Sequence, residues 1–132
     1  SVEHALEFVS ACYVQELDQL IRQRKYKNKL NLEEVRRYID SYYAGPITLE
    51  QLAKNFFVSK EYMSKVFKQE YGQNVTDYIV ERRMEKAREW LANKQISIKA
   101  VAEMAGYEDV SYFYRVFKKH FGMAPGEMRK EV

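Results

Sequence analysis

Apolar residues recur along this chain at intervals of three and four, which is the spacing of one buried face on an amphipathic helix. A first stripe of this kind covers residues 2–20, and a basic run from Arg22 to Lys29 follows it. Further stripes cover residues 32–42, 49–56, 63–71, 79–91, 98–102 and 113–121. In the second stripe we expect Val35, Ile39 and Tyr42 to face inward. The pattern predicts an all-helical chain.

Polar residues and glycines mark the ends of the expected helices. Side chains that can accept a backbone N–H precede four of them, at Thr48, Ser59, Ser97 and Asp109. Gly72 and Gly122 follow two of these helices, where glycine tolerates the left-handed conformation that ends a helix. The longest stripe predicts a helix from about Thr76 to Asn93.

One segment of the chain occurs twice, at residues 47–72 and 96–122. Each copy predicts two short helices joined by a tight turn, and the second copy has one extra residue in its turn. Ala53 and Ala102 are small enough for the two helices to cross closely, and Gly106 suits the second turn. Five residues of the first copy recur in and directly after the second helix of the other copy. They are Tyr62, Val66, Phe67, Lys68 and Gly72, which correspond to Tyr112, Val116, Phe117, Lys118 and Gly122. Two helix-turn-helix units are therefore expected.

The expected fold is all-α, with two helix-turn-helix subdomains joined by a long connecting helix and preceded by an N-terminal linker helix. We expect an N-terminal helix and basic linker at 1–30 and a first subdomain at 31–75. The connecting helix should cover 76–94, and the second subdomain 95–132. A hydrophobic content of 46% is ample for a packed core.

Composition limits the classes of function. The net charge of +3 is only mildly basic and alone says little about partners. Cys12 is the single cysteine, which excludes an intramolecular disulfide and fits a reducing cytoplasm. No apolar run approaches the ~20 residues that span a bilayer, so no membrane association is expected. Because the chain begins with serine, we expect a fragment of a longer protein.

Enzyme chemistry finds little support in the sequence. It has no glycine-rich phosphate loop and no zinc-ligand spacing, so neither a cofactor nor a metal is expected. His4 and Cys12 lack further ligand candidates nearby, and His120 follows two lysines. We therefore expect a binding protein.

The duplication favours duplex DNA as the partner. Each second helix is apolar on one face only, which leaves its other face free to enter a major groove. A connecting helix of eighteen residues spans ~27 Å, compatible with reading helices in adjacent grooves about 34 Å apart. A helical protein-interaction module that uses the same two faces is the alternative. RNA binding is less favoured, since an aromatic sheet platform and an arginine-rich arm are lacking.

The segment from residue 32 to about 130 resembles the DNA-binding domain of the AraC/XylS family of bacterial transcription regulators. The most specific pattern lies in the second unit, in 102–107, Tyr112-Phe113, 115–118, Phe121-Gly122, Pro125 and Arg129. The chain departs from the family at Met128, where an aromatic residue is more frequent. The resemblance implies a cytoplasmic, sequence-specific regulator that binds double-stranded DNA. It also implies RNA polymerase as a further partner.

Many family members carry this domain at the C-terminus, behind a sensory domain. Some, such as YesN-like proteins, are two-component response regulators with a receiver domain and a helical linker. The helix expected at residues 2–20 fits such a layout. It can pack back onto the domain or form a homodimer, and a preceding domain can also mediate dimerisation.

Family members insert the second helix of each unit into the major groove. Carried over by position, the candidates for reading base edges are Glu61, Ser64, Lys65, Val110, Ser111, Tyr114 and Arg115. The candidates for phosphate contact are Lys60, Lys68, Lys118 and Lys119. Arg115 has the strongest physical case because a guanidinium can bond O6 and N7 of guanine together. A phosphate contact or an ion pair is its alternative role.

Overall fold

A computed structural model describes residues 30–131, and the regular structure within this range is entirely helical. The chain divides into two units, Ser1–Asn31 and Leu32–Val132. The helix and basic run expected at residues 2–29 lie outside the described residues. The second unit contains α2 (Leu32–Tyr42), α3 (Leu49–Asn55), α4 (Lys60–Tyr71), α5 (Val75–Leu91), α6 (Ile98–Met104), α7 (Val110–Phe121) and α8 (Pro125–Glu131).

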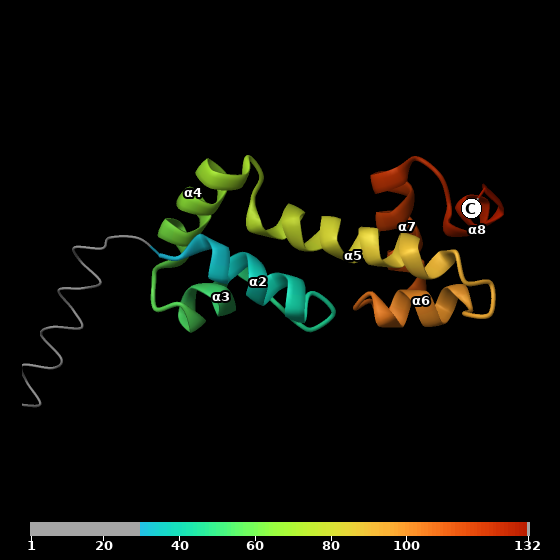
Figure 1. The fold of residues 1–132 in the computed structure, drawn as a ribbon, viewed down its shortest axis with the longest axis horizontal. Coiled ribbons are helices and arrows are strands. Elements are labelled where there is room, and N and C mark those ends of the chain that lie inside the picture. Colours follow the sequence, from blue (N-terminus) through green and yellow to red (C-terminus); the bar gives the residue numbers. More distant parts are fainter. Residues whose placement is uncertain (1–29, 132) are drawn as a thin grey trace, which may run out of the picture. The chain divides into compact units, whose positions relative to one another are not determined.

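Helix α5 connects two helix-turn-helix units, as Figure 1 shows. Helices α3 and α4 pack together near its start, whereas α6, α7 and α8 pack on its later part. Its 17 residues span about 26 Å. The expected all-α fold with a connecting helix is confirmed. The boundaries expected between the subdomains within Leu32–Val132 stay a prediction.

Side-chain caps begin the helices where the sequence predicts them. The oxygens of Thr48, Ser59 and Ser97 accept the N–H of the residue three positions later at 3.1, 3.1 and 3.0 Å. Asp109 accepts the Ser111 N–H at 2.9 Å. Asn74, which was not among the expected caps, accepts the Asp77 N–H at 2.8 Å, so α5 begins one residue earlier than expected. Each cap of this kind contributes about 0.5–2 kcal/mol.

Each helix-turn-helix unit has its own apolar core. The buried residues of the first include Val35, Ile39, Leu52, Met63 and Phe67, and those of the second include Met84, Leu91, Val101, Phe113 and Phe117. Ala53 and Ala102 are also buried, as the close helix crossing requires. The inward position expected for Tyr42 is wrong, because its side chain is 57% exposed. Tyr42 ends α2, and its ring packs against the Tyr38 ring at a centroid distance of 4.7 Å.

Two arginines bind carbonyl groups at or just after the end of the helix that precedes each unit. Arg83 of α5 donates to the carbonyls of Tyr43 at 2.7 Å and Gly45 at 2.9 Å. Arg129 of α8 donates to the carbonyls of Leu91 at 3.1 Å and Ile96 at 2.6 Å. Carbonyls at a helix end lack partners inside the helix, so these arginines satisfy acceptors that would otherwise need water. They tie each loop to the helix that follows its unit.

Candidate nucleic-acid interface

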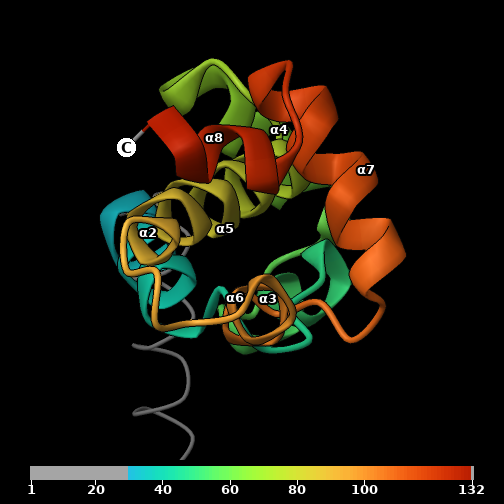
Figure 2. The same ribbon diagram turned by 90° about the vertical axis from the view of Figure 1, so that its right-hand side faces the viewer.

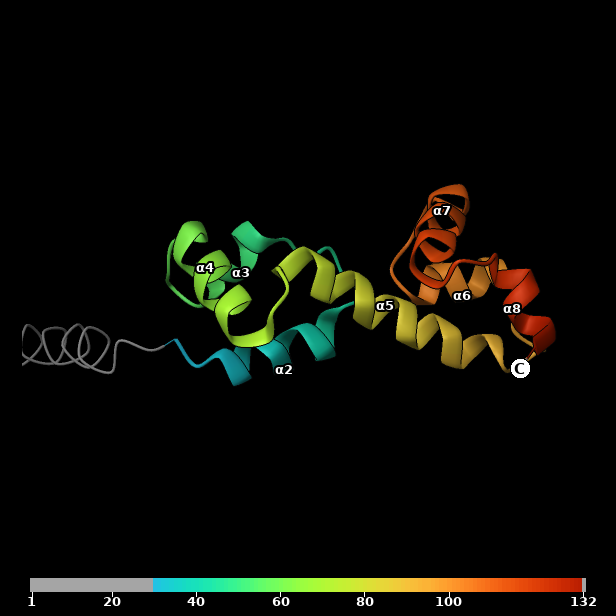
Figure 3. The same ribbon diagram turned by 90° about the horizontal axis from the view of Figure 1, so that it is seen from above.

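Helices α4 and α7 are the second helices of the two units, and each buries one face only. The buried inner face of α4 includes Met63 and Phe67, and that of α7 includes Phe113 and Phe117. Figures 2 and 3 show α4 and α7 on one side of α5 and α2 on the other. The two outer faces are therefore available on the same side of the connecting helix.

The outer face of α4 presents most of the residues that the sequence singles out. Exposed side chains are those of Lys60, Glu61, Lys65 and Lys68, while Ser64 is half-buried. The Lys60 ammonium lies 3.6 Å from a carboxylate oxygen of Glu50 on α3. This surface ion pair adds little stability, and it leaves the lysine at the start of the helix for a phosphate to approach.

The outer face of α7 is more basic. Its exposed side chains include Ser111, Tyr114, Arg115, Lys118 and Lys119. The last turn holds Lys118, Lys119 and His120 together, whereas Lys68 is the basic residue in the last turn of α4. Val110 differs from the others because it is half-buried and packs against the second core. Part of the apolar surface of Val110 is thus buried against the core and is not available to a partner.

Tyr112 belongs to this face, although the sequence marks it only as a repeated aromatic anchor. Its side chain is 51% exposed, and the guanidinium carbon of Arg115 lies 5.6 Å from its ring centroid. A cation over an aromatic face is attracted by the ring, so Tyr112 holds Arg115 close to α7. The spacing of three residues between them is the signal that could have identified the pair.

A groove of 670 Å³ lies between α7 and the first half of α5. Arg115 and Lys119 line it from α7, and Asp77 and Glu81 line it from α5. The two carboxylates repel phosphate from this edge of α7. Because Arg115 and Lys119 themselves line this groove, the two carboxylates partly offset the positive charge of this edge of α7.

Within residues 30–131, no group of three or more His, Cys, Asp or Glu residues is placed to hold a metal ion. No helix in this part of the chain is long and apolar enough to cross a membrane. The polar and charged side chains of this part of the chain lie at or near its surface, since its buried residues are apolar or aromatic.

The family comparison identifies the repeated unit. Residues 52–131 match a family described as a helix-turn-helix domain. The uncharacterized HTH-type transcriptional regulator YdiP of Escherichia coli (strain K12) is 32% identical over 105 residues, which are 80% of this chain and 35% of that protein. The match covers 35% of YdiP and 37% of the Msm operon regulatory protein of Streptococcus mutans, so the chain spans about a third of the length of each.

Solved structures show the same arrangement of helices. One is the C-terminal domain of the two-component response regulator yesN from Fusobacterium nucleatum subsp. nucleatum. It is 34% identical, with a TM-score of 0.71 over 74% of this chain and 95% of that chain. The C-terminal domain of AraT, a response regulator from Geobacillus stearothermophilus, is 35% identical with a TM-score of 0.74. That match covers 76% of this chain and 84% of that chain.

Proposed function

The chain belongs to the AraC/XylS family of helix-turn-helix DNA-binding transcription regulators, and from this membership we propose that α4 and α7 enter two successive major grooves of one duplex. The observation that carries the proposal is the exposure of one polar face on each helix, both on the same side of α5. A connecting helix of about 26 Å suits grooves one turn apart, about 34 Å.

Base reading is assigned to the side chains that project from the outer faces. Arg115 bonds O6 and N7 of a guanine, and Lys65 bonds the same acceptors with less directional control. Glu61 accepts from N4 of a cytosine, and Val110 uses its remaining exposed surface against a thymine methyl group. Ser64, Ser111 and Tyr114 complete the reading set.

Phosphate contacts are assigned to the lysines at the ends of the same helices. Lys60 and Lys68 serve α4, and Lys118 and Lys119 serve α7. Backbone N–H groups at the starts of both helices add donors that point along the helix axis. These contacts position the protein on the duplex without reading its sequence.

The remaining assignments concern the longer protein. We place the chain as the output domain of a two-component response regulator in the bacterial cytoplasm, because two similar structures are C-terminal domains of response regulators. It activates or represses transcription in contact with RNA polymerase, it forms homodimers through residues 1–20 or a preceding domain, and it has no catalytic activity. Sedimentation at several concentrations tests the dimer, and transcription with purified polymerase distinguishes activation from repression.

Salt-dependent binding to duplex DNA tests the function and separates it from the alternative. Titration of fluorescent random duplex between 50 and 200 mM salt should show a steep loss of affinity, because lysine–phosphate contacts release counterions. Lys118→Ala should bind more weakly than Lys130→Ala on α8, which removes the same single charge from another helix and serves as the matched control. A protein-interaction module would show no salt-dependent binding in any of the three.

A further inference from the structure

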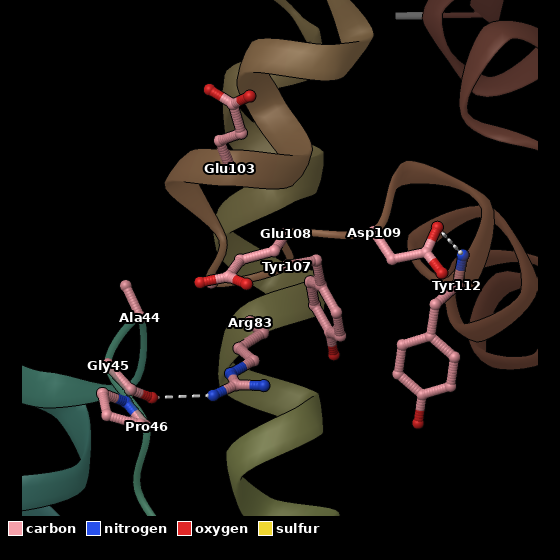
Figure 4. Close-up of a pocket in the computed structure, with 10 residues that line it drawn as sticks. Ala44, Gly45, Pro46, Arg83, Glu103, Tyr107, Glu108, Asp109 and Tyr112 are labelled. Atoms are coloured by element: carbon pink, nitrogen blue, oxygen red, sulfur yellow. Dashed lines mark hydrogen bonds between the residues drawn. The ribbon is translucent and has the colours of Figure 1, made fainter.

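The Arg83 guanidinium contacts two different parts of the molecule. Two donors along one edge of the guanidinium bind the carbonyls of Tyr43 and Gly45, in the loop that leads into the first helix-turn-helix unit. Its guanidinium carbon also lies over the ring of Tyr107, 5.1 Å from the ring centroid. Figure 4 shows the loop, Arg83 and Tyr107 side by side. One side chain on α5 therefore contacts both units.

A backbone contact lies beside this arginine. Gly106, in the turn of the second unit, approaches Ala44 so closely that a Cβ on Gly106 would lie 2.9 Å from the Ala44 carbonyl oxygen. It would also lie 3.0 Å from the Ala44 Cα. Since both groups are backbone, neither can move aside by changing a rotamer. The loop of the first unit and the turn of the second thus meet directly.

Tyr107 is fixed in the core of the second unit. Its side chain is only 6% exposed, and its hydroxyl lacks a hydrogen-bond partner among the described residues. Burial raises the pKa of this hydroxyl, and the proximity of the Arg83 guanidinium partly offsets that effect. The Tyr107 hydroxyl is therefore neutral, and the packing of the second core fixes the position of the ring. The contact with this ring thus ties Arg83 to the second unit.

We propose that Arg83 and the contact between Ala44 and Gly106 fix the rotation of one helix-turn-helix unit relative to the other, so that the protein selects operators by the spacing between two base blocks. Helix α5 sets the distance along its own axis. The junction, which consists of Arg83, Tyr107 and the contact between Ala44 and Gly106, lies off that axis. It opposes rotation of one unit relative to the other about the axis of α5. Arg83 is a positioning residue, and its role in spacing selection rests on the proposed binding to two grooves.

The junction explains why arginine is needed at this position. A guanidinium is planar, so its edge can bind two carbonyls while its face covers an aromatic ring. A lysine ammonium has no such plane and cannot do both. Arg83→Lys should therefore behave like Arg83→Ala in spacing selection, although it keeps the positive charge.

The test uses a duplex with both preferred blocks and variants with one or two base pairs inserted between them. Each inserted pair moves the second block by about 3.4 Å along the axis and rotates it. The parent chain should lose at least about tenfold in affinity on insertion, which is within the range for a lost base contact. Arg83→Ala should lose less than about threefold, because its units can readjust to the new spacing.

Arg82→Ala is the matched control. Arg82 is the adjacent arginine on the same helix, but its guanidinium pairs with the carboxylates of Asp40 and Glu85 instead of the loop carbonyls. It should keep the tenfold discrimination of the parent. Tyr107→Leu provides a second variant if Arg83→Ala fails to fold, because it removes the ring and leaves both carbonyl bonds of Arg83 intact. It should also reduce the discrimination.

A distance measurement without DNA separates this inference from the proposed function. Spin labels at Gln51→Cys on α3 and Lys99→Cys on α6, with Cys12→Ser, report on the two units directly. The parent should give one narrow distance distribution, and Arg83→Ala a broad one. An unchanged distribution together with unchanged spacing selection in Arg83→Ala would overturn the inference. If the parent shows no salt-dependent binding to duplex DNA, the proposed function fails while the label measurement still decides the junction.

Discussion

Phe57 and Gly106 occupy the same place in the turns of the two helix-turn-helix units, and both have a positive φ, 57° and 101°. The Phe57 N–H binds the Lys54 carbonyl at 3.1 Å, and the Gly106 N–H binds the equivalent Glu103 carbonyl at 3.0 Å. The turns therefore share their hydrogen bonds as well as their handedness. The same turn is thus formed by a bulky aromatic residue in the first unit and by a glycine in the second.

Phe57→Gly should stabilise the domain. A non-glycine residue in the left-handed region costs about 1–2 kcal/mol, and the added freedom of glycine in the unfolded chain cancels part of the gain. Because the Phe57 side chain is 77% exposed, little packing is lost. Urea unfolding should show an increase of about 0.5–1 kcal/mol. A decrease would mean that the contacts of the Phe57 ring outweigh the strain in its backbone.

Gly106→Ala should be the more damaging of two matched glycine substitutions. At Gly122 a Cβ meets nothing within 4 Å, so Gly122→Ala should cost only the strain of a positive φ, about 1 kcal/mol. At Gly106 the same methyl group meets the backbone of Ala44 as well, so the cost should exceed about 2 kcal/mol. Unfolding by urea measures both. Equal losses would contradict the close contact between the loop and the turn.

Arg115→Ala should weaken specific binding by about 1–3 kcal/mol and relax the preference at one base pair. Tyr112→Ala should weaken the same base preference to a smaller extent, because Arg115 keeps its donors but loses the ring that holds it. Titration over every single-base variant of the operator measures the preference. Uniform weakening at all positions would assign Arg115 to phosphate contact instead.

Lys118→Ala should reduce the dependence of affinity on salt by the share of about one phosphate contact. Its effect should be similar for the operator and for unrelated duplexes, because a phosphate contact carries no base information. Lys130→Ala is the control of equal charge from α8. If both substitutions leave the slope unchanged, Lys118 has no phosphate contact.

The helices and the repeat are predictable from the sequence because their causes are local. Caps such as Thr48 and Ser97 act within three residues, and the apolar stripes depend on helical spacing alone. The repeat indicates the arrangement, since two similar patterns joined by a helix leave few alternatives. The residues proposed to read bases are carried over by position from the family resemblance, and the titrations described above test their roles.

The junction is not predictable in this way, because its contacts join residues far apart in the chain. Arg83 binds carbonyls 38 and 40 positions earlier, and the sequence shows only one more helical arginine. The wrong prediction for Tyr42 has a related cause. Periodicity assigns a face to a residue but does not tell whether a neighbouring element covers the end of that helix.

Selection of bound sites from a random duplex library is the decisive measurement for binding to two successive grooves. Two tandem reading helices within one chain should select an asymmetric site, with two short blocks about one helical turn (10–10.5 base pairs) apart, bound by a single chain. Recovery of a single block, or of a palindrome in which each of two chains reads only one block, would show that the two helices do not read one duplex in tandem.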